Sequence, residues 1–185
     1  MIALERYLNS FGKSVVNKSK GILDRKKKVV TGALKNSIKF KLVKTSQGIN
    51  VEFSMLDYGK FMDKGVSGVG GEIKTGKNKG SYTGIRDFVS YKGQRMKSPY
   101  SYKSKMPPTS VFDKWTVMRG IAPRDAKGRF MSRSGLKFAI ARSIFIKGIE
   151  GVSFFQKPLG LELRGFATEV GKAIKEDILN NIRKW

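Results

Sequence analysis

The sequence contains no cysteine and no histidine. This absence excludes disulfides, iron-sulfur clusters, zinc sites built on Cys or His, and catalysis by Ser-His-Asp or Cys-His groups. Acidic residues are scarce, with 14 Asp plus Glu against 38 Lys plus Arg in 185 residues, so the formal net charge is +24. A surplus this large repels itself unless an anionic partner neutralises it, and nucleic acid is the first candidate partner.

Long apolar runs are also lacking. No segment approaches the roughly 18 apolar residues that span a bilayer, and residues 1–10 lack the basic-then-apolar pattern of a signal peptide. We therefore expect a soluble protein that is not secreted and has no membrane contact. The composition, 39% hydrophobic and 11% aromatic, is sufficient to bury a core in one domain, or in one domain with a large insertion.

Apolar spacing predicts helices at both ends of the chain. A stripe with helical spacing runs through residues 1–30 and consists of Leu4, Leu8, Phe11, Val15 and Ile22. Apolar residues also recur every three or four positions from Leu159 to Ile182, which predicts one amphipathic helix of more than six turns that serves as a packing element. Alternating apolar and polar residues over 37–55, interrupted by a turn at 45–48, predict a β-hairpin.

Weaker patterns predict shorter elements between these. Residues 56–64 suit one or two helical turns, Thr109 or Ser110 can cap a helix through Met118, and residues 134–147 suit another helix. Residues 66–107 show no period and look like a long extended excursion, with nine basic residues against two acidic ones. Segments of that length in a compact domain are usually functional or disordered.

The acidic residues offer no evident catalytic or metal site. The nearest clusters are Asp57 with Asp63, which sit among lysines, and Glu176 with Asp177, which we assign to a solvated helix face. The glycines of 65–71 are not followed by the Gly-Lys-Ser or Gly-Lys-Thr of a phosphate-binding loop. We therefore expect no enzymatic activity, no metal and no cofactor.

Two basic regions are candidate contacts for DNA or a protein partner. The run at the end of the first helix suits a nucleic-acid patch, but solvation and the helix dipole also favour such a run. In the aperiodic segment, tyrosines between lysines suit base stacking, although the same mixture suits a protein interface, which we favour. The candidate contact residues are Arg25, Lys26, Lys27, Lys28, Lys74, Lys77, Lys79, Tyr82, Tyr91, Arg95, Tyr100, Tyr102, Lys103 and Lys105.

Three short segments, in order, resemble motifs of the head-tail connector, neck and tail-completion proteins of tailed bacteriophages. Residues 31–38 resemble the motif T-G-x-L-(R/K)-x-S-I, residues 58–66 resemble Y-A-x-Y-(V/M)-E-x-G-T, and residues 154–159 resemble the P-F-(L/x)-x-P-A segment before the closing helix. The residues that carry the resemblance are Thr31, Gly32, Leu34, Ser37, Ile38, Tyr58, Phe61, Asp63, Gly65, Phe155 and Pro158. Asp63 stands where the family usually has Glu.

The resemblance implies an α+β fold in which a small antiparallel sheet is packed by long N-terminal and C-terminal helices. Residues 1–66 and 150–185 would form the connector-like core, and 67–149 a basic insertion with one or two helices. It further implies a virion structural protein, assembled in the host cytoplasm, that forms a homo-oligomeric ring around the DNA channel. Its partners would be other neck, portal or tail proteins, with non-specific DNA contact. The alternative is a stand-alone basic nucleic-acid-binding protein.

Overall fold

The computed structural model describes residues 2–27, 31–74, 79–122, 124, 127–130 and 132–183, so the candidate contacts Lys28 and Lys77 lie outside the described residues. The fold is α+β, as predicted, with long helices near both ends of the chain and small antiparallel sheets. The chain forms two compact units. Unit 1 comprises the described residues of 1–59, 89–94 and 153–185, and unit 2 those of 60–88 and 95–152.

These units divide the chain differently from the predicted core and insertion. Unit 2 begins at Lys60, before the predicted boundary at residue 66, and ends at Val152. The segment Val89–Gln94, which lies inside the predicted insertion, belongs to unit 1.

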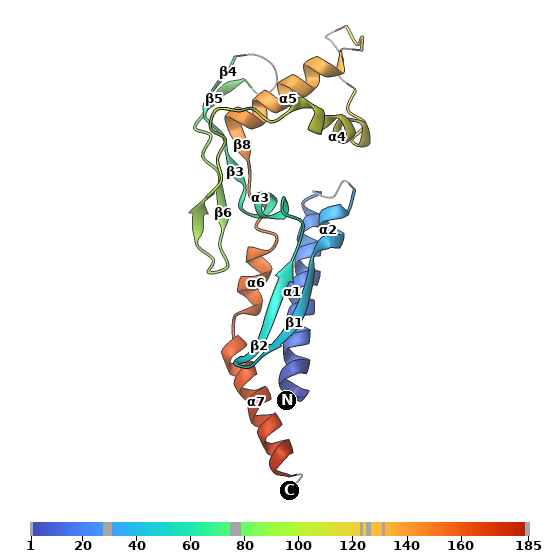
Figure 1. The fold of residues 1–185 in the computed structure, drawn as a ribbon. Coiled ribbons are helices and arrows are strands. Elements are labelled where there is room, and N and C mark those ends of the chain that lie inside the picture. The colour runs from blue at the N-terminus through green and yellow to red at the C-terminus, as the bar shows by residue number, and fades with distance from the viewer. Residues whose placement is uncertain are drawn as a thin grey trace. The chain divides into compact units, whose positions relative to one another are not determined.

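A long helix and a hairpin form the framework of unit 1. The helix α1 (Ile2–Arg25) lies along β1 (Lys39–Thr45) and β2 (Gly48–Ser54), which pair antiparallel (Figure 1). Successive side chains of a strand point to opposite faces. Accordingly the half-buried Phe40 and Leu42 lie opposite Phe53 and Val51, whereas Lys41 and Glu52 are exposed. The predicted first helix and the predicted hairpin are confirmed.

The core of unit 1 lies between α1, the hairpin and α7 (Phe166–Ile182). Ala3, Leu4, Leu8 and Ala173 are buried together, with half-buried side chains of the hairpin and of α7 packed against them. The Phe11 ring lies 4.8 Å from that of Phe166, measured between centroids. Burying a large apolar side chain contributes about 1.5–3 kcal/mol, so this contact fixes α7 against α1.

The predicted continuous C-terminal helix is wrong, because two helices occupy that region. α6 (Gln156–Glu162) ends before residues 163–165, and α7 begins after Gly165. Gly165 adopts φ 78°, in the left-handed region that interrupts an α-helix and that glycine enters at little cost. The apolar spacing of three or four residues continues across the break and conceals it.

Two short helices flank the hairpin. α2 (Ala33–Ser37) connects α1 to β1, and α3 (Gly59–Lys64) follows β2, as the pattern over 56–64 predicts. Downstream of α3, unit 2 contains strands of two or three residues where the sequence predicts an extended excursion. β3 (Val66–Ser67) pairs antiparallel with β8 (Gly148–Ile149), and β4 (Gly71–Ile73) with β5 (Gly80–Tyr82). β6 (Asp87–Val89) and β7 (Arg95–Lys97) form another two-stranded sheet.

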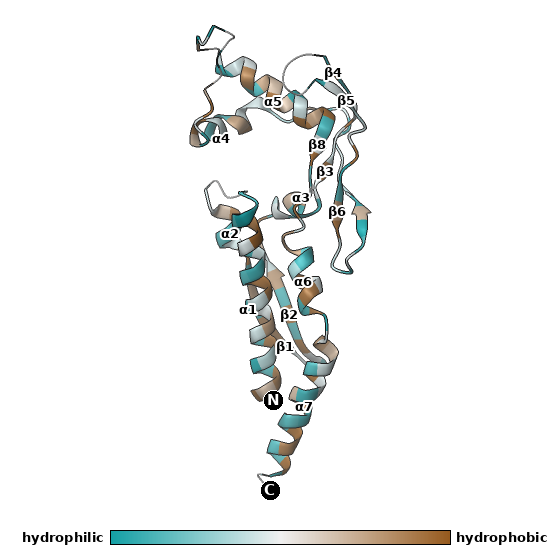
Figure 2. Ribbon diagram, turned by 180° about the vertical axis from the view of Figure 1, so that it is seen from behind, coloured by the Kyte–Doolittle hydropathy of each residue, from teal (hydrophilic) through white to brown (hydrophobic). Residues whose placement is uncertain are grey.

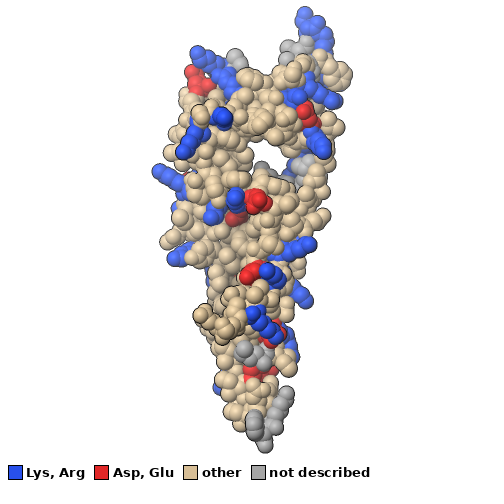
Figure 3. Space-filling model, viewed as in Figure 1, with Lys and Arg blue, Asp and Glu red and all other residues tan. Residues whose placement is uncertain are grey.

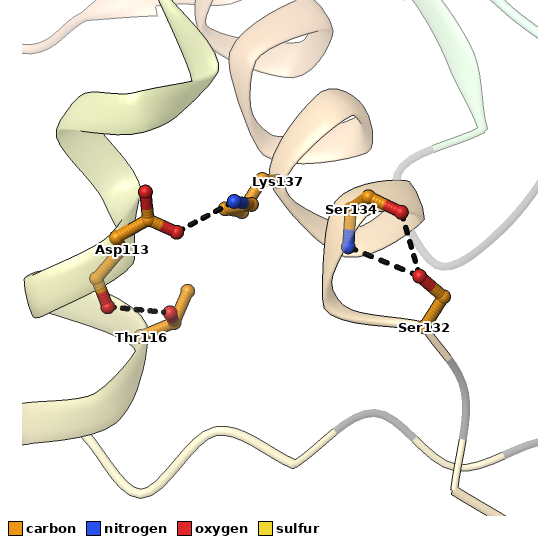
Figure 4. A network of polar contacts seen from close by, with 5 residues as sticks. All are labelled: Asp113, Thr116, Ser132, Ser134 and Lys137. Carbon is orange, nitrogen blue, oxygen red and sulfur yellow. Dashed lines mark hydrogen bonds and ion pairs between the residues drawn. The ribbon is translucent and has the colours of Figure 1, made fainter.

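An ion pair joins two helices of unit 2 (Figure 4). The Lys137 ammonium of α5 (Arg133–Lys147) forms an ion pair of 2.5 Å with Asp113 of α4 (Phe112–Met118), and Thr116 Oγ1 donates a hydrogen bond to the Asp113 carbonyl. Ser132 caps α5, since its Oγ accepts the N–H of Ser134 at 3.3 Å. The predicted caps of α4 are wrong: Thr109 and Ser110 lie inside a 3₁₀ turn, Thr109–Val111, that precedes the helix.

Candidate functional site

The first family motif folds into the connection between α1 and β1. Thr31 Oγ1 accepts the N–H of Ala33 at 3.3 Å, and Gly32 adopts φ 77° just before α2. Leu34 is 8% exposed and Ile38 is fully buried, so both side chains belong to the core of unit 1. These contacts give the motif residues a structural role in turning the chain.

Ser37 joins two segments of unit 1. Its Oγ donates to the Leu34 carbonyl at 2.8 Å and accepts the Leu56 N–H at 3.1 Å. The hydroxyl therefore holds the end of α2 to the segment that follows β2. A hydroxyl side chain is required for both bonds, because an apolar side chain can neither donate nor accept a hydrogen bond.

The second motif spans α3 and contributes packing in unit 2. The Phe61 ring lies 4.7 Å from that of Tyr100 in an edge-to-face contact, and Asp63 is 3% exposed. Gly65 follows α3 with φ 75°. Tyr58, in unit 1, remains 45% exposed. Asp63 is thus buried, whereas Asp57 is exposed.

The third motif leads into α6. The Phe155 ring contacts the Phe53 ring of β2, with 5.3 Å between centroids, and Pro158 is fully buried. A proline in the first turn of a helix removes no hydrogen bond, so Pro158 fits this position. The third motif, like the first, thus fixes secondary-structure elements of unit 1 to one another.

The basic run at the end of α1 is exposed over its described part. Arg25, Lys26 and Lys27 lie on the last turn of the helix and just beyond it, where the helix dipole favours cations. The neighbouring Asp24 pairs with Lys35 at 2.7 Å. The run therefore suits a contact with a partner. The helix dipole and solvation also explain it, so both interpretations of the sequence remain.

The tyrosines of the aperiodic segment are mostly engaged in packing. The Lys147 ammonium lies 4.3 Å from the Tyr82 ring centroid, Tyr100 packs against Phe61, and Tyr102 packs against Phe145 at 6.1 Å. Burial raises the pKa of the Tyr102 hydroxyl above its ordinary value. Rings held in this way are poorly placed to stack on nucleic-acid bases. Tyr91, in unit 1, is the exception at 44% exposure.

The described lysines of the same segment are exposed. Lys74, Lys79, Lys103 and Lys105 are all exposed, whereas Arg95 is exposed but paired with Asp87 at 3.0 Å. Figure 3 shows Lys and Arg scattered over the visible face with Asp and Glu between them, rather than gathered into one patch. These candidate contacts are thus exposed, and the face in Figure 3 shows no continuous basic stripe.

An apolar face of α7 was missed by the sequence reasoning, which assigned the whole stripe to packing. Phe166 and Val170 are half-buried, but the apolar residues nearer the C-terminal end of the helix are exposed. Figure 2 shows that apolar residues continue along α7 toward that end. We call this exposed part the distal α7 face. Its residues and their exposed fractions are Ile174 at 40%, Ile178 at 53%, Leu179 at 43% and Ile182 at 64%.

The assignment of Asp177 to a solvated helix face is wrong. Asp177 is 7% exposed, and its carboxylate oxygens accept the N–H groups of Ala3 and Leu4, each at 3.0 Å. Desolvation raises the pKa of the carboxyl, but the hydrogen bonds from α1 outweigh it and hold the pKa below its ordinary value. Asp177 therefore caps the first turn of α1 from another helix.

Glu162 makes a second polar link to α1. Its Oε1 accepts the Ser14 hydroxyl at 2.8 Å and forms an ion pair with Lys18. Desolvation raises the pKa of Glu162, but the bonds from Lys18 and Ser14 lower it by more. These partners come from positions far apart in sequence, so spacing alone could not have identified them.

Among the described residues, no three His, Cys, Asp or Glu side chains group closely enough to hold a metal ion. In the same part of the chain, no helix has the length and apolar character required to cross a membrane. No family model matches the chain, and no curated protein and no solved structure matches it.

Proposed function

We propose that this protein is a virion structural component of the head-tail connector of a tailed phage, in the neck or at tail completion. In this proposal it assembles in the host cytoplasm into a homo-oligomeric ring around the DNA channel. Its role is assembly rather than catalysis, with neck, portal or tail proteins as neighbours. The motif order and the α+β fold support this proposal, and the distal α7 face carries it.

The distal α7 face supports self-association because it exposes large apolar side chains on successive helical turns. Ile174, Ile178 and Ile182 recur every four residues, which places them on one side of α7. Exposed apolar surfaces that are contiguous usually mark an interaction site. A helix face of this kind is stabilised when another protein covers it.

A second copy of the chain is the occupant that we propose for this face. The exposed charges of α7 balance, with Glu169 and Glu176 against Lys172 and Lys175, and Glu169 is paired with Lys172 at 2.7 Å. In a molecule whose net charge is +24, two copies therefore repel each other less at this apolar and balanced helix than at the basic parts of the surface. Contact between two different surfaces of one protein is heterologous and closes into a ring when the rotation permits.

In such an assembly the exposed lysines would contact neighbouring proteins rather than DNA. Tight binding of DNA by the lumen of a channel would hinder its passage. We therefore place most of the exposed lysines of the aperiodic segment, such as Lys103 and Lys105, against acidic surfaces of neighbouring virion proteins. An assembled particle in which these lysines line the lumen and touch no other chain would contradict this placement.

The mass of the native assembly tests the proposal. Native mass spectrometry should give one dominant species whose mass is an integer multiple of the 20.7 kDa protomer. The double variant Ile178→Glu/Ile182→Glu should shift the protein to monomer, because two carboxylates then occupy the covered face. The control Val117→Glu alters a residue of α4 that is 59% exposed and should leave the assembly intact.

Three outcomes would contradict the proposal. A wild-type protein that is monomeric at high micromolar concentration would exclude ring formation. Equal dissociation of the α7 variant and the Val117→Glu control would exclude the distal α7 face as the interface. A wild-type protein that forms open, concentration-dependent polymers rather than a closed species would exclude a closed ring.

A stand-alone nucleic-acid-binding protein is the second candidate, and the exposed lysines favour it. For such a protein, log affinity for duplex DNA falls with log salt with a slope of about 0.9 per neutralised phosphate. A monomer with a steep slope supports this candidate. A ring with negligible DNA affinity at physiological salt supports the connector.

A further inference from the structure

A groove in unit 1 lies between the turn at 90–93 and the helix α6, and continues to the start of the α6–α7 break. Its volume is about 490 Å³, and its lining includes Lys92, Lys157 and Arg164 together with Leu161 and Leu163. Among the described residues that line it, none is acidic. The groove therefore combines three cations with apolar side chains.

The wall of the groove is fixed by backbone contacts. The Tyr91 N–H donates to Gln156 Oε1 at 3.1 Å, and the Val89 N–H donates to Ser153 Oγ at 2.8 Å. A Cβ atom added at Gly160 would overlap the Tyr91 carbonyl oxygen, so glycine allows the turn to lie directly on α6. The cations thus project from two backbone segments held together before any ligand binds, which lowers the entropic cost of binding.

Charge in the groove is not compensated within the described part of the chain. There, none of the three cations forms an ion pair with an acidic residue, although the Lys92 ammonium lies 5.8 Å from the Tyr91 ring centroid. Ser90 also lines the groove, is 6% exposed, and has a buried hydroxyl without a hydrogen-bond partner.

We propose that this groove binds an acidic segment of a partner protein. Carboxylates of the segment pair with Lys92, Lys157 and Arg164, and an apolar side chain between them packs on Leu161 and Leu163, which are 50% and 39% exposed. The leucines favour a peptide over a nucleic-acid backbone, because a chain of phosphates and sugars offers them no apolar partner. This site is separate from the distal α7 face and does not depend on ring formation.

Fluorescence anisotropy with the full-length protein tests the proposal. The probe is a fluorescein-labelled octapeptide in which Asp and Glu alternate with Leu, and its matched comparison replaces each Asp with Asn and each Glu with Gln. The acidic peptide should bind, and the amide peptide should bind at least about tenfold more weakly because charge-assisted bonds are lost. A labelled single-stranded DNA octamer is measured in parallel.

Charge reversal separates the groove from the general positive charge. Lys157→Glu/Arg164→Glu should weaken binding of the acidic peptide by about tenfold or more. The control Lys13→Glu/Lys39→Glu makes the same change of charge at exposed positions of α1 and β1 outside the groove lining, and should change the affinity by less than about twofold, since exposed charges are screened by salt. Circular dichroism confirms that both variants remain folded.

Several results would overturn the proposal. Equal weakening by the groove and control variants would show attraction to net charge alone. Equal binding of the acidic and amide peptides would remove the ionic recognition. Loss of DNA binding in the groove variant, with no loss of peptide binding, would assign the groove to phosphate. In the supporting case, amide NMR shifts on adding the acidic peptide concentrate at 90–93 and 157–164.

Discussion

The carboxylate of Asp177 links the two ends of unit 1. It accepts the first N–H groups of α1, which have no partner within their own helix, through Ala3 and Leu4. The folded-state pKa lies below the ordinary value, so the folded protein releases this proton more readily than the unfolded chain does. The resulting stability is complete above the unfolded-state pKa and is lost as pH falls through the folded-state pKa.

The substitution Asp177→Asn should lower the urea midpoint of unfolding at neutral pH, because an amide places only one acceptor oxygen where the carboxylate places two. The difference from the wild type should shrink at acid pH, where the wild-type carboxyl is also protonated. Glu176→Gln, at the exposed neighbouring position, is the control and should leave the midpoint unchanged. A difference from the wild type that stays constant from neutral to acid pH would contradict the role assigned to the charge.

Ser37 is a motif residue whose hydroxyl makes two hydrogen bonds. Replacing it with Ala leaves the Leu56 N–H and the Leu34 carbonyl without this partner, and should reduce the free energy of unfolding by about 1 kcal/mol. Ser46→Ala, in the exposed hairpin turn, should change it by less than about 0.5 kcal/mol. Chemical denaturation measures both, and equal effects would show that the motif serine has no special structural role.

At the scale of elements, replacing the glycine just before α7 and replacing a glycine within α7 should change the stability in opposite directions. Gly165 has φ 78°, so Gly165→Ala should cost about 1–2 kcal/mol of stability from backbone strain alone, since an added Cβ meets nothing within 4 Å. Gly171 lies inside α7 with equal free space, and Gly171→Ala should stabilise by about 0.5–1 kcal/mol. Denaturation midpoints that move in the same direction would contradict the break between α6 and α7.

The same two helices show what periodicity can predict. The patterns over residues 1–30 and 37–55 predicted α1 and the hairpin, because their apolar side chains face one core. The pattern over 159–182 is equally regular, yet it did not reveal the break between α6 and α7. A three-residue spacing is compatible both with a helix and with a turn at Gly165. It also cannot tell whether the rest of the same chain covers the stripe, so the distal α7 face appeared only in the structure.

The short strands of unit 2 and the groove could not be predicted from the sequence, for a different reason. Strands of three residues, such as β4 and β5, are too short to establish an alternation. The groove depends on Lys92 lying near Lys157 and Arg164, which are distant in sequence. Candidate cations could be named from composition, but their grouping required the contact of the 90–93 turn with α6.

For the whole molecule, the net charge of +24 destabilises the folded state, because the excess cations repel one another. The ion pairs in the described part do little to relieve it. They join exposed or half-exposed side chains, such as Lys41 with Glu52 at 2.9 Å, and pairs of this kind contribute about 0–1 kcal/mol each. Repulsion among the excess cations should therefore outweigh the attraction within these pairs.

Salt consequently should stabilise the fold. Raising sodium chloride from about 20 mM to about 300 mM shortens the Debye length below the usual spacing of surface charges, which weakens repulsion and pairing together. Because repulsion dominates, the thermal midpoint of the monomeric Ile178→Glu/Ile182→Glu variant should rise by about 3 °C or more, equivalent to about 1 kcal/mol for a chain of this size. Choline chloride at equal ionic strength should give a similar rise, because screening does not depend on the cation. A midpoint that falls with salt would show that the ion pairs, rather than the surplus of Lys and Arg, control the electrostatic stability of the protein.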